Sequence, residues 1–505
     1  MNSNGLILGH ISGKPSLWRG IKGLFDRSLP ANRAVRRFLA ACQRKERKHL
    51  VRLTKAIHTA VFAPTGAGKG VSCVIPFLLT CKESCFVLDV KDGELARVTA
   101  DARRRMGRNV YIIDPYRCVT KTPATLNPVE FVDKNSPYAL DDSREIAAEI
   151  VERKDEKGDG VHFLDNAEAG IAAVIAMCVE YAEGDQKSLQ AVCDITSRPD
   201  RFAKAIELMV TSTAQEGMVA REGGNLMHLK DRELASTMTT IARFLRFLST
   251  PALAASTRVS SFDPKEILNG NTDVYCVLPS DRVGTLSPLL RLWTGTFLRT
   301  ALRAKGKNRI HFICDEAGSS LGKMDQLSKA LTVGRSAGIR LQLYYQDLGQ
   351  LKKCWPDGAD QTLLANVNQV FFGVNDKETA EYVSARLGDA TIIVDDWGES
   401  ESQQREGSGK PASHSRTRNL NHKQVARKLL KPEEILSGLH EREAITFAPG
   451  LPPIWTWLTR YYEEDYGQSD GPGPVKMAID AMCLFLASAM LAAMCTAGLF
   501  QGVFR

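Results

Sequence analysis

The sequence predicts an α/β fold built on a mainly parallel β-sheet, and three observations indicate it. Apolar strand-like segments at 59–63, 84–89 and 109–114 alternate with helical ones, such as 95–105. The first of these segments runs into a glycine-rich turn. A later apolar strand at 310–314 ends in two adjacent carboxylates. Because ligands of parallel sheets bind at the carboxyl ends of the strands, we expect these features to meet at one edge.

The glycine-rich turn has the composition of a phosphate-binding loop. Residues 59–80 read TAVFAPTGAGKGVSCVIPFLLT, a strand, a turn and an apolar helix in succession. Its glycines let backbone N–H groups converge on an anion at the positive end of a helix. Lys69 would reach the β- and γ-phosphates. The predicted nucleotide-binding residues are Pro64, Thr65, Gly66, Ala67, Gly68, Lys69, Gly70 and Val71.

This loop departs at two positions from the common pattern G-x-x-x-x-G-K-[ST]. Ala63 stands where the first glycine is expected, and Gly70 stands where a Mg²⁺-binding Ser or Thr is expected. A Gly-Lys-Gly turn that binds no nucleotide is therefore the alternative to a phosphate-binding loop.

The adjacent carboxylates supply the groups that nucleotide hydrolysis needs. Asp315 would hold Mg²⁺, directly or through water, and Glu316 would take a proton from the attacking water. Two solvated acids at a strand end are the alternative. A further strand at 340–345 ends at Gln346, which could orient water or contact a γ-phosphate, or could be a polar strand end. The predicted catalytic side chains are Lys69, Glu316 and Gln346.

Composition bounds the partners and the compartment. The 505 residues exceed one ordinary core, so two or three domains are expected. The formal charge of +8 favours a polyanionic partner such as nucleic acid or anionic lipid. The twelve cysteines form no C-x-x-C pair and no zinc-finger spacing, so the pattern predicts neither a disulfide framework nor a metal site. We expect the globular part to lie in a reducing cytoplasm.

Strand signals nearly vanish between 136 and 260, where helical patterns dominate, and they return at 272–278. We expect Arg243 and Arg246, in this helical part, to be salt-bridged surface residues. The loop 398–421 is rich in Ser, Gly and Arg, and we expect it to be disordered. The predicted segments are an N-terminal strand and basic arm (1–55), two parts of a nucleotide-binding domain (56–135 and 261–466), an all-α domain (136–260) and a C-terminal membrane segment (475–504).

The membrane prediction rests on Ala481–Phe500, an uncharged run long enough to cross ~30 Å of hydrocarbon as a helix. A buried C-terminal helix is the alternative. The basic arm also holds a possible amphipathic helix from Trp18 to Leu29, which could lie on a membrane surface or track phosphates. A solvated arm, or a helix packed on its own domain, explains that pattern equally well.

Several stretches together resemble one family. They include APTGAGKGVSCVIPFLL at 63–79, VLDVKDGE at 87–94, FDPKEILNGNTDVYCVLP at 262–279 and FFGVNDKETAEYVSARLG at 371–388. With them the chain resembles the TraG/TraD coupling proteins of type IV secretion and conjugation, in the RecA-like motor superfamily that also holds the FtsK and HerA translocases. Gly-Lys-Gly is similar to this family's own form of the loop. Typical members begin with two membrane helices, whereas the candidate here lies at the opposite end.

The resemblance implies a RecA-like P-loop NTPase domain with a mixed, mainly parallel sheet and an inserted all-α domain. The apolar run at 481–500, and not the resemblance, adds a C-terminal transmembrane helix to this fold class. It implies an ATP- and Mg²⁺-dependent homo-hexamer at the bacterial inner membrane, in which Arg335 or Arg340 could serve as the arginine contributed to a neighbour's site. The implied cargo is single-stranded DNA bound to a relaxase, or protein effectors, delivered to the inner-membrane components of a secretion channel. An ATPase that delivers only protein effectors and a non-hydrolysing membrane adaptor remain as alternatives.

Overall fold

The structure, a computed structural model, describes residues 5–11, 49–54, 56–153, 159–304, 306, 308–404 and 413–463. The predicted membrane segment at 475–504 and the possible amphipathic helix of the basic arm lie outside these residues. Among the described residues, one helix is long and apolar enough to cross a membrane, Val161–Tyr181, with a mean hydropathy of 1.3. Its apolar window is 61% buried, as in the core helix of a soluble domain.

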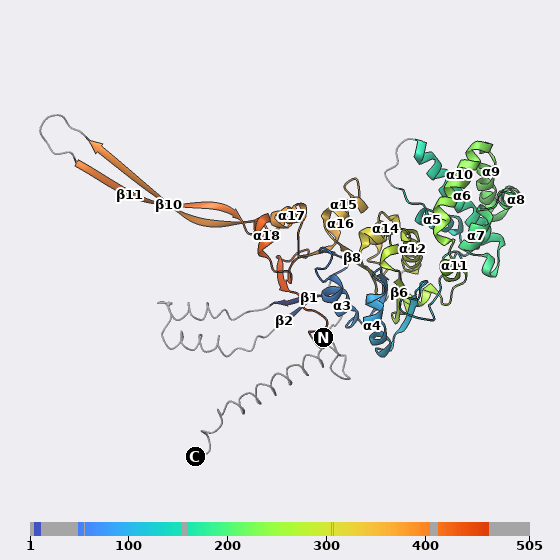
Figure 1. Ribbon diagram of the computed structural model, residues 1–505, viewed down its shortest axis with the longest axis horizontal. Helices are drawn as coiled ribbons and strands as arrows, with labels where there is room; N and C mark the ends of the chain where they lie inside the picture. Colours follow the sequence, from blue (N-terminus) through green and yellow to red (C-terminus); the bar gives the residue numbers. More distant parts are fainter. Residues whose placement is uncertain are drawn as a thin grey trace, which may run out of the picture.

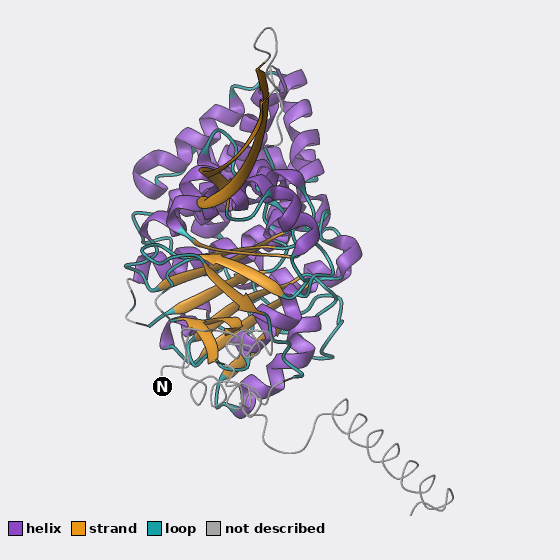
Figure 2. Cartoon of the chain, turned by 90° about the vertical axis from the view of Figure 1, so that its left-hand side faces the viewer, coloured by secondary structure: helices purple, strands orange, loops and turns teal. Residues whose placement is uncertain are grey.

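A mixed eleven-stranded sheet is the main β-structure of the described chain (Figures 1 and 2). Its strand order is β2-β1-β13-β12-β9-β3-β8-β7-β4-β6-β5. The seven strands from β9 to β5 are parallel to one another, and the four others pair antiparallel. The strands are β1 (Leu6–Ile11), β2 (His49–Leu53), β3 (Thr59–Phe62), β4 (Ser84–Asp89), β5 (Asn109–Ile113), β6 (Thr272–Val277), β7 (Ile310–Cys314), β8 (Ile339–Tyr345), β9 (Asn368–Phe372), β12 (Glu443–Phe447) and β13 (Ile454–Trp457). The predicted mixed, mainly parallel sheet is thus confirmed.

The sheet is buried on both faces, because successive side chains of each central strand enter different cores. Along β4, Phe86 and Leu88 belong to one hydrophobic core, whereas Cys85 and Val87 belong to a second. This two-sided burial explains why these strands read as continuous apolar runs in the sequence. The helices of this part are α3 (Ile75–Leu78), α4 (Glu94–Arg105), α12 (Ser287–Ala304), α13 (Ala317–Ser320), α14 (Asp325–Val333), α15 (Leu348–Cys354), α16 (Ala359–Asn366), α17 (Lys377–Leu387) and α18 (Pro432–Gly438).

One buried charge cluster fixes α4 to the sheet. Asp273 of β6 accepts hydrogen bonds from Arg103 Nε and Nη2, both at 2.7 Å, and from Arg108 Nε at 2.8 Å. It also accepts the backbone N–H of Cys85 at 3.0 Å. All three charged residues are buried. Two cations therefore depend on a single carboxylate for their neutralisation.

The helices between residues 139 and 258 enclose a hydrophobic core of their own. They lie on the far side of the molecule from the two-stranded ribbon of β10 (Asp389–Gln404) and β11 (Ser413–Lys428) (Figure 1). The helices are α5 (Ala139–Ile150), α6 (Asp159–Tyr181), α7 (Leu189–Thr196), α8 (Pro199–Val210), α9 (Met218–Met227), α10 (Asp231–Leu245) and α11 (Pro251–Arg258). The all-α domain that the family resemblance implies is present.

A polar contact joins this domain to α12 of the sheet domain. Buried Glu149 of α5 pairs with Arg299, and its carbonyl oxygen accepts a hydrogen bond from Arg291 Nε at 2.8 Å. Burial raises the pKa of Glu149 to about 7, although Arg299 opposes the shift. A Cβ at Gly295 would lie 1.7 Å from Glu149 Oε1, so only glycine leaves space for this carboxylate.

Within the range 398–421, where we expected a disordered loop, residues 398–404 and 413–421 are strands, and residues 405–412 lie outside the described residues. Strands β10 (Asp389–Gln404) and β11 (Ser413–Lys428) form a two-stranded antiparallel ribbon that projects from the sheet domain (Figure 1). Its register is unbroken from Asp389 opposite Lys428 to Gln404 opposite Ser413. Polar composition gave no sign of it, because a ladder of backbone hydrogen bonds can propagate from a short apolar start such as TIIV at 391–394 without an apolar core.

Candidate nucleotide-binding site

The carboxyl ends of the neighbouring strands β3, β8, β7 and β4 bring the predicted site residues to one edge of the sheet. The phosphate-binding loop follows β3, Gln346 follows β8, and Asp315 and Glu316 follow β7. The structure therefore places the glycine-rich turn and the two carboxylates at the same edge of the sheet, as the sequence predicted.

The loop has the open backbone, with left-handed conformations at two glycines, that an anion-binding site needs. Gly66 and Gly68 have φ of +86° and +95°, values that disfavour other residues. A Cβ at Gly66 would meet nothing within 4 Å, so the exposed loop leaves space beside its backbone. The helix that follows begins with a π-helical turn, Gly70–Val74, and continues as α3. A Cβ at Gly70 would meet only Leu95 Cδ2, at 3.9 Å. A Ser or Thr would therefore fit at this position, and packing does not explain why glycine stands there.

Lys69 points back into the loop. It is 3% exposed, and its Nζ donates a hydrogen bond to the carbonyl oxygen of Ala63 at 2.8 Å. The same atom lies 3.2 Å from Glu316 Oε1. The residue at the first-glycine position thus holds the lysine through its backbone, which explains how Ala63 can replace that glycine.

Glu316 is held by three side chains. Its Oε1 lies 3.2 Å from Lys91 Nζ as well as from Lys69 Nζ, and its Oε2 accepts a hydrogen bond from Gln346 Nε2 at 3.2 Å. The residue is 7% exposed and adopts a left-handed backbone conformation, with φ of 49°. Burial alone would raise the pKa of Glu316, but Lys69 and Lys91 more than offset it, so the pKa lies below its usual value. The carboxylate is therefore ionised and able to accept a proton near neutral pH.

Asp315 is almost completely buried and only half satisfied. Its Oδ2 lies 3.2 Å from Lys91 Nζ, whereas its Oδ1 has no hydrogen-bond partner. Burial raises the pKa of this carboxyl, against the opposing charge of Lys91. An unpartnered carboxylate oxygen beside a phosphate-binding loop suits a Mg²⁺ ion or a water that Mg²⁺ carries. The residues present therefore fit the predicted metal.

Lys91 is the residue of this group that sequence reasoning missed. It belongs to the VKDGE stretch after β4, where the chain turns through Asp92 and Gly93, both with positive φ. Its ion pairs with Asp315 and Glu316 raise its own pKa, despite partial burial. The signal available in the sequence was its place just after a parallel strand next to β7, at the edge where ligands bind.

Two aspartates follow or end strands at this edge, Asp89 at the end of β4 and Asp114 directly after β5, and both make structural contacts. Asp89 Oδ2 accepts the backbone N–H of Ala96 at 2.8 Å, and burial raises its pKa to about 7. Asp114 accepts three backbone N–H groups of the turn 118–120. The two carboxylates fix the turns that surround the site.

The predicted arginines lie elsewhere. Arg335 and Arg340 stand before and within the amino-terminal part of β8, at the edge opposite the loop. Arg243 and Arg246 do not belong to any ion pair found among the described residues, in contrast to the expectation. Instead they line a cavity of about 570 Å³ between the all-α domain and the sheet domain. The cavity also contains Phe244, Phe247, Tyr116, Arg282 and Glu152.

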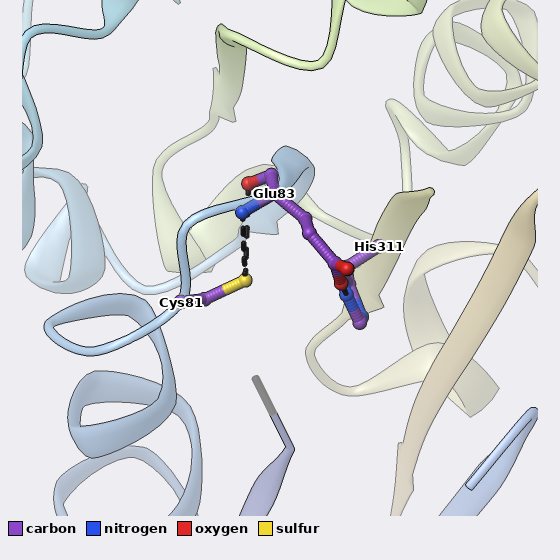
Figure 3. Close-up of side chains that lie close together, drawn as sticks. All are labelled: Cys81, Glu83 and His311. Atoms are coloured by element: carbon purple, nitrogen blue, oxygen red, sulfur yellow. Dashed lines mark hydrogen bonds and ion pairs between the residues drawn. The ribbon is translucent and has the colours of Figure 1, made fainter. Parts of the chain in front are cut away.

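A second cluster of polar side chains lies at that opposite edge (Figure 3). One ligand atom each of Cys81, Glu83 and His311 lies within 4.8 Å of the others. His311 Nε2 and Glu83 Oε2 are 2.6 Å apart, and Arg309 lies 3.5 Å from Glu83. These distances describe an internal ion-pair cluster that joins the start of β4 to the start of β7. No sequence spacing could indicate it, because Glu83 and His311 are 228 positions apart.

Comparison with known proteins agrees with the resemblance seen in the sequence. A family model described as "Type IV secretory system Conjugative DNA transfer" matches residues 26–482. Protein VirD4 of Agrobacterium fabrum is 30% identical over 81% of this chain and 59% of its own length. The type IV secretion system-coupling protein VirD4 of Bartonella henselae is 27% identical over 79% and 61%, and the conjugal transfer protein TraG of Escherichia coli is 26% identical over 88% and 74%.

The chain thus spans about 60% of the length of the VirD4 proteins that it matches. Among solved structures, the bacterial conjugative coupling protein TrwBdeltaN70 has a TM-score of 0.57 at 19% identity, covering 81% of this chain and 86% of that one. TrwB in complex with ADP and Mg²⁺ has a TM-score of 0.57 at 18% identity, covering 81% and 87%. These structures confirm the predicted α/β fold with a mixed, mainly parallel sheet. The predicted C-terminal transmembrane helix lies outside the described residues.

Proposed function

Because the chain belongs to the type IV secretory system conjugative DNA transfer family, we propose that it is the ATP-driven coupling protein of such a system. It recruits single-stranded DNA bound to a relaxase, or protein substrates, and passes them to the inner-membrane components of the secretion channel. It works as a homo-hexamer at the inner membrane, with the globular part in the cytoplasm.

The observation that carries this proposal is the group formed by Lys69, Glu316, Lys91 and Asp315 at the phosphate-binding loop. Each of the two lysines has its ammonium nitrogen 3.2 Å from a carboxylate oxygen of this group, and all four residues lie at the carboxyl ends of the strands. If these acids only capped the end of a strand, we would expect them to be exposed to solvent. Instead both are buried, and Asp315 Oδ1 has no hydrogen-bond partner. The arrangement therefore supports nucleotide hydrolysis rather than a bare turn.

Each side chain takes one role. Lys69 and the loop N–H groups would bind the phosphates, and Asp315 would hold Mg²⁺, directly or through a bound water. The ion would neutralise phosphate charge. Glu316 accepts the proton of the attacking water. Gln346 orients Glu316 and that water from β8. Lys91 keeps Glu316 ionised.

One charge is missing from this set. Arg335 and Arg340 stand at the opposite edge of their own subunit and do not reach its loop. In ring-shaped motors a neighbour commonly supplies the arginine that stabilises the developing phosphate charge. This is why the proposal includes an oligomer, with these two residues as candidates for the contribution to the next site.

The cavity between the two domains supports a nucleic-acid cargo. Arg243 lies over the ring of Phe244 at 4.7 Å, and Arg282 lies over Tyr116 at 5.8 Å. Cations interleaved with aromatic rings suit a single strand, because guanidinium groups neutralise phosphates and rings stack on bases. The alternatives, a protein-only cargo and an adaptor that does not hydrolyse ATP, would leave this arrangement without a use.

The test is ATP turnover by the full-length protein in detergent, with and without single-stranded DNA. Stimulation by DNA supports the proposal, basal turnover that DNA does not change favours a protein-only cargo, and no turnover favours the adaptor. Lys69→Ala should abolish turnover, whereas the surface variant Lys352→Gln should keep it. Turnover by the Lys69 variant at the wild-type rate would remove the loop from the mechanism.

A further inference from the structure

The chain returns to the phosphate-binding loop at its last described segment, far from the motifs that predicted the site. Strand β13 pairs antiparallel with β12, and β12 pairs antiparallel with β9, which is parallel to β3. The carboxyl end of β13 therefore points to the same edge as the loop after β3. The residues after Trp457 emerge beside that loop.

Two sets of bonds fix this segment. The backbone N–H of Tyr461 donates to the carbonyl oxygen of Val71 at 2.9 Å, which attaches it to the first turn of the loop helix. Arg442 pairs with Glu463 at 2.7 Å, and the N–H of Glu463 donates to the carbonyl oxygen of Arg460 at 2.9 Å. The position of residue 460 is thus set by the fold and not by its side chain.

The side chain of Arg460 lies against the loop. Its Nη1 would be 3.1 Å, and its Cζ 3.5 Å, from a Cβ at Gly68, so glycine at this position leaves room for the guanidinium. The side chain is 16% exposed, and its Nε is buried without a hydrogen-bond partner. The carboxylate found near it belongs to Glu441, an exposed residue at 3.5 Å.

The positive charge of the Arg460 guanidinium is only weakly neutralised within the protein, which favours an anionic ligand beside it. Lys69 is neutralised by buried Glu316 at 3.2 Å, whereas Arg460 has only a longer, solvent-exposed pairing. A buried donor without a partner is costly unless a ligand satisfies it. A guanidinium offers a fork of N–H donors that matches phosphate oxygens.

We propose that Arg460 is a nucleotide-binding residue, whose guanidinium contacts the phosphate chain of the nucleoside triphosphate held by the loop of the same subunit. This inference rests on the proposed function, since it assigns one more contact within that site. It also gives the late strand β13 a role in nucleotide binding, through the segment that it carries to the loop.

The experiment measures the affinity of the full-length protein for a fluorescent ATP analogue and for inorganic tripolyphosphate. The variant Arg460→Gln keeps the stem of the side chain and removes the charge. We expect its dissociation constants for both ligands to rise by at least about tenfold, the loss that follows from one charge-assisted hydrogen bond. An unchanged affinity for either ligand would overturn the assignment to the phosphate chain.

Glu441→Gln is the matched control. If Arg460 contacts phosphate, freeing it from Glu441 leaves the affinity equal or tighter. If Arg460 only braces the loop by its pairing with Glu441, this control weakens binding as Arg460→Gln does, and the inference fails. Wild-type protein that binds neither ligand would refute the proposed function itself, whereas wild-type binding with an unaffected Arg460 variant would refute only this inference.

Discussion

Replacing Lys91 by Gln tests the electrostatics of the site most directly. The Lys91 ammonium lies 3.2 Å from a carboxylate oxygen of both Asp315 and Glu316. At that separation and an effective dielectric constant of ~20, each attraction is about 5 kcal/mol before screening. Because 35% of the lysine side chain is exposed, we discount this to on the order of 1 kcal/mol, the upper range for solvent-accessible pairs.

The sign of the effect follows from what Lys91 stabilises. It favours the ionised forms of both carboxyls, so its loss makes each of them easier to protonate. A change of about 1 kcal/mol raises the proton affinity of Glu316 roughly fivefold. We therefore expect the acidic limb of the turnover–pH profile to move to higher pH, with activity near pH 8 retained better than activity near pH 5.

The assay is steady-state ATP turnover between pH 4.5 and 9, with Lys352→Gln as the control. Lys352 pairs with Glu378 on the surface, away from the site, so its removal should leave the profile unchanged. A Lys91 variant whose activity falls by the same factor at every pH would show that Lys91 binds substrate or metal rather than setting the protonation of Glu316. That result would refute the reasoning.

Three further predictions concern stability. Asp273→Asn leaves two buried arginines without their carboxylate and should cost about 3–5 kcal/mol in urea unfolding; a loss well under that range would show that the cluster is not neutralised by Asp273. Burial raises the pKa of Asp89 from 3.8 to about 7, so the native state prefers its protonated form and loses stability as pH rises through that window. Asp89→Asn should therefore raise the melting temperature more at pH 8 than at pH 5, and a pH-independent difference would contradict the titration. Gly295→Ala places a Cβ on Glu149 and should cost about 1–3 kcal/mol, whereas Gly224→Ala, whose Cβ meets nothing within 4 Å, should not; equal stabilities would sink the argument.

The central strands and the loop could be predicted because their physics is local. A strand buried on both faces must be apolar throughout. The strands β4 and β7 can therefore be recognised from their own sequences, without knowledge of the strands they pair with. The loop needs glycines at particular positions, and these are visible in the sequence. The edge at which Glu316 meets Lys69 then follows from the rule that parallel strands share a direction.

Other parts depend on pairings that no local pattern encodes. Lys91 looks like any lysine in a turn, and only the adjacency of β4 and β7 brings it to Glu316. Arg460 lies at the loop because two antiparallel pairings reverse the chain direction twice. The β10–β11 ribbon depends on a register between polar strands, and composition indicated disorder instead.

The strand order also sets the time at which the sheet can close. Strand β1 joins the sheet through β13, and the hydroxyl of Thr456 donates to the carbonyl oxygen of Leu8, 448 positions earlier. During synthesis Leu8 emerges from the ribosome 448 residues before its partner Thr456. Leu6 and Leu8, buried in the finished fold, must stay exposed to solvent or chaperones until then. Because this pairing joins segments so far apart in the sequence, we expect the addition of β1 to the sheet to be a slow and aggregation-prone step of folding.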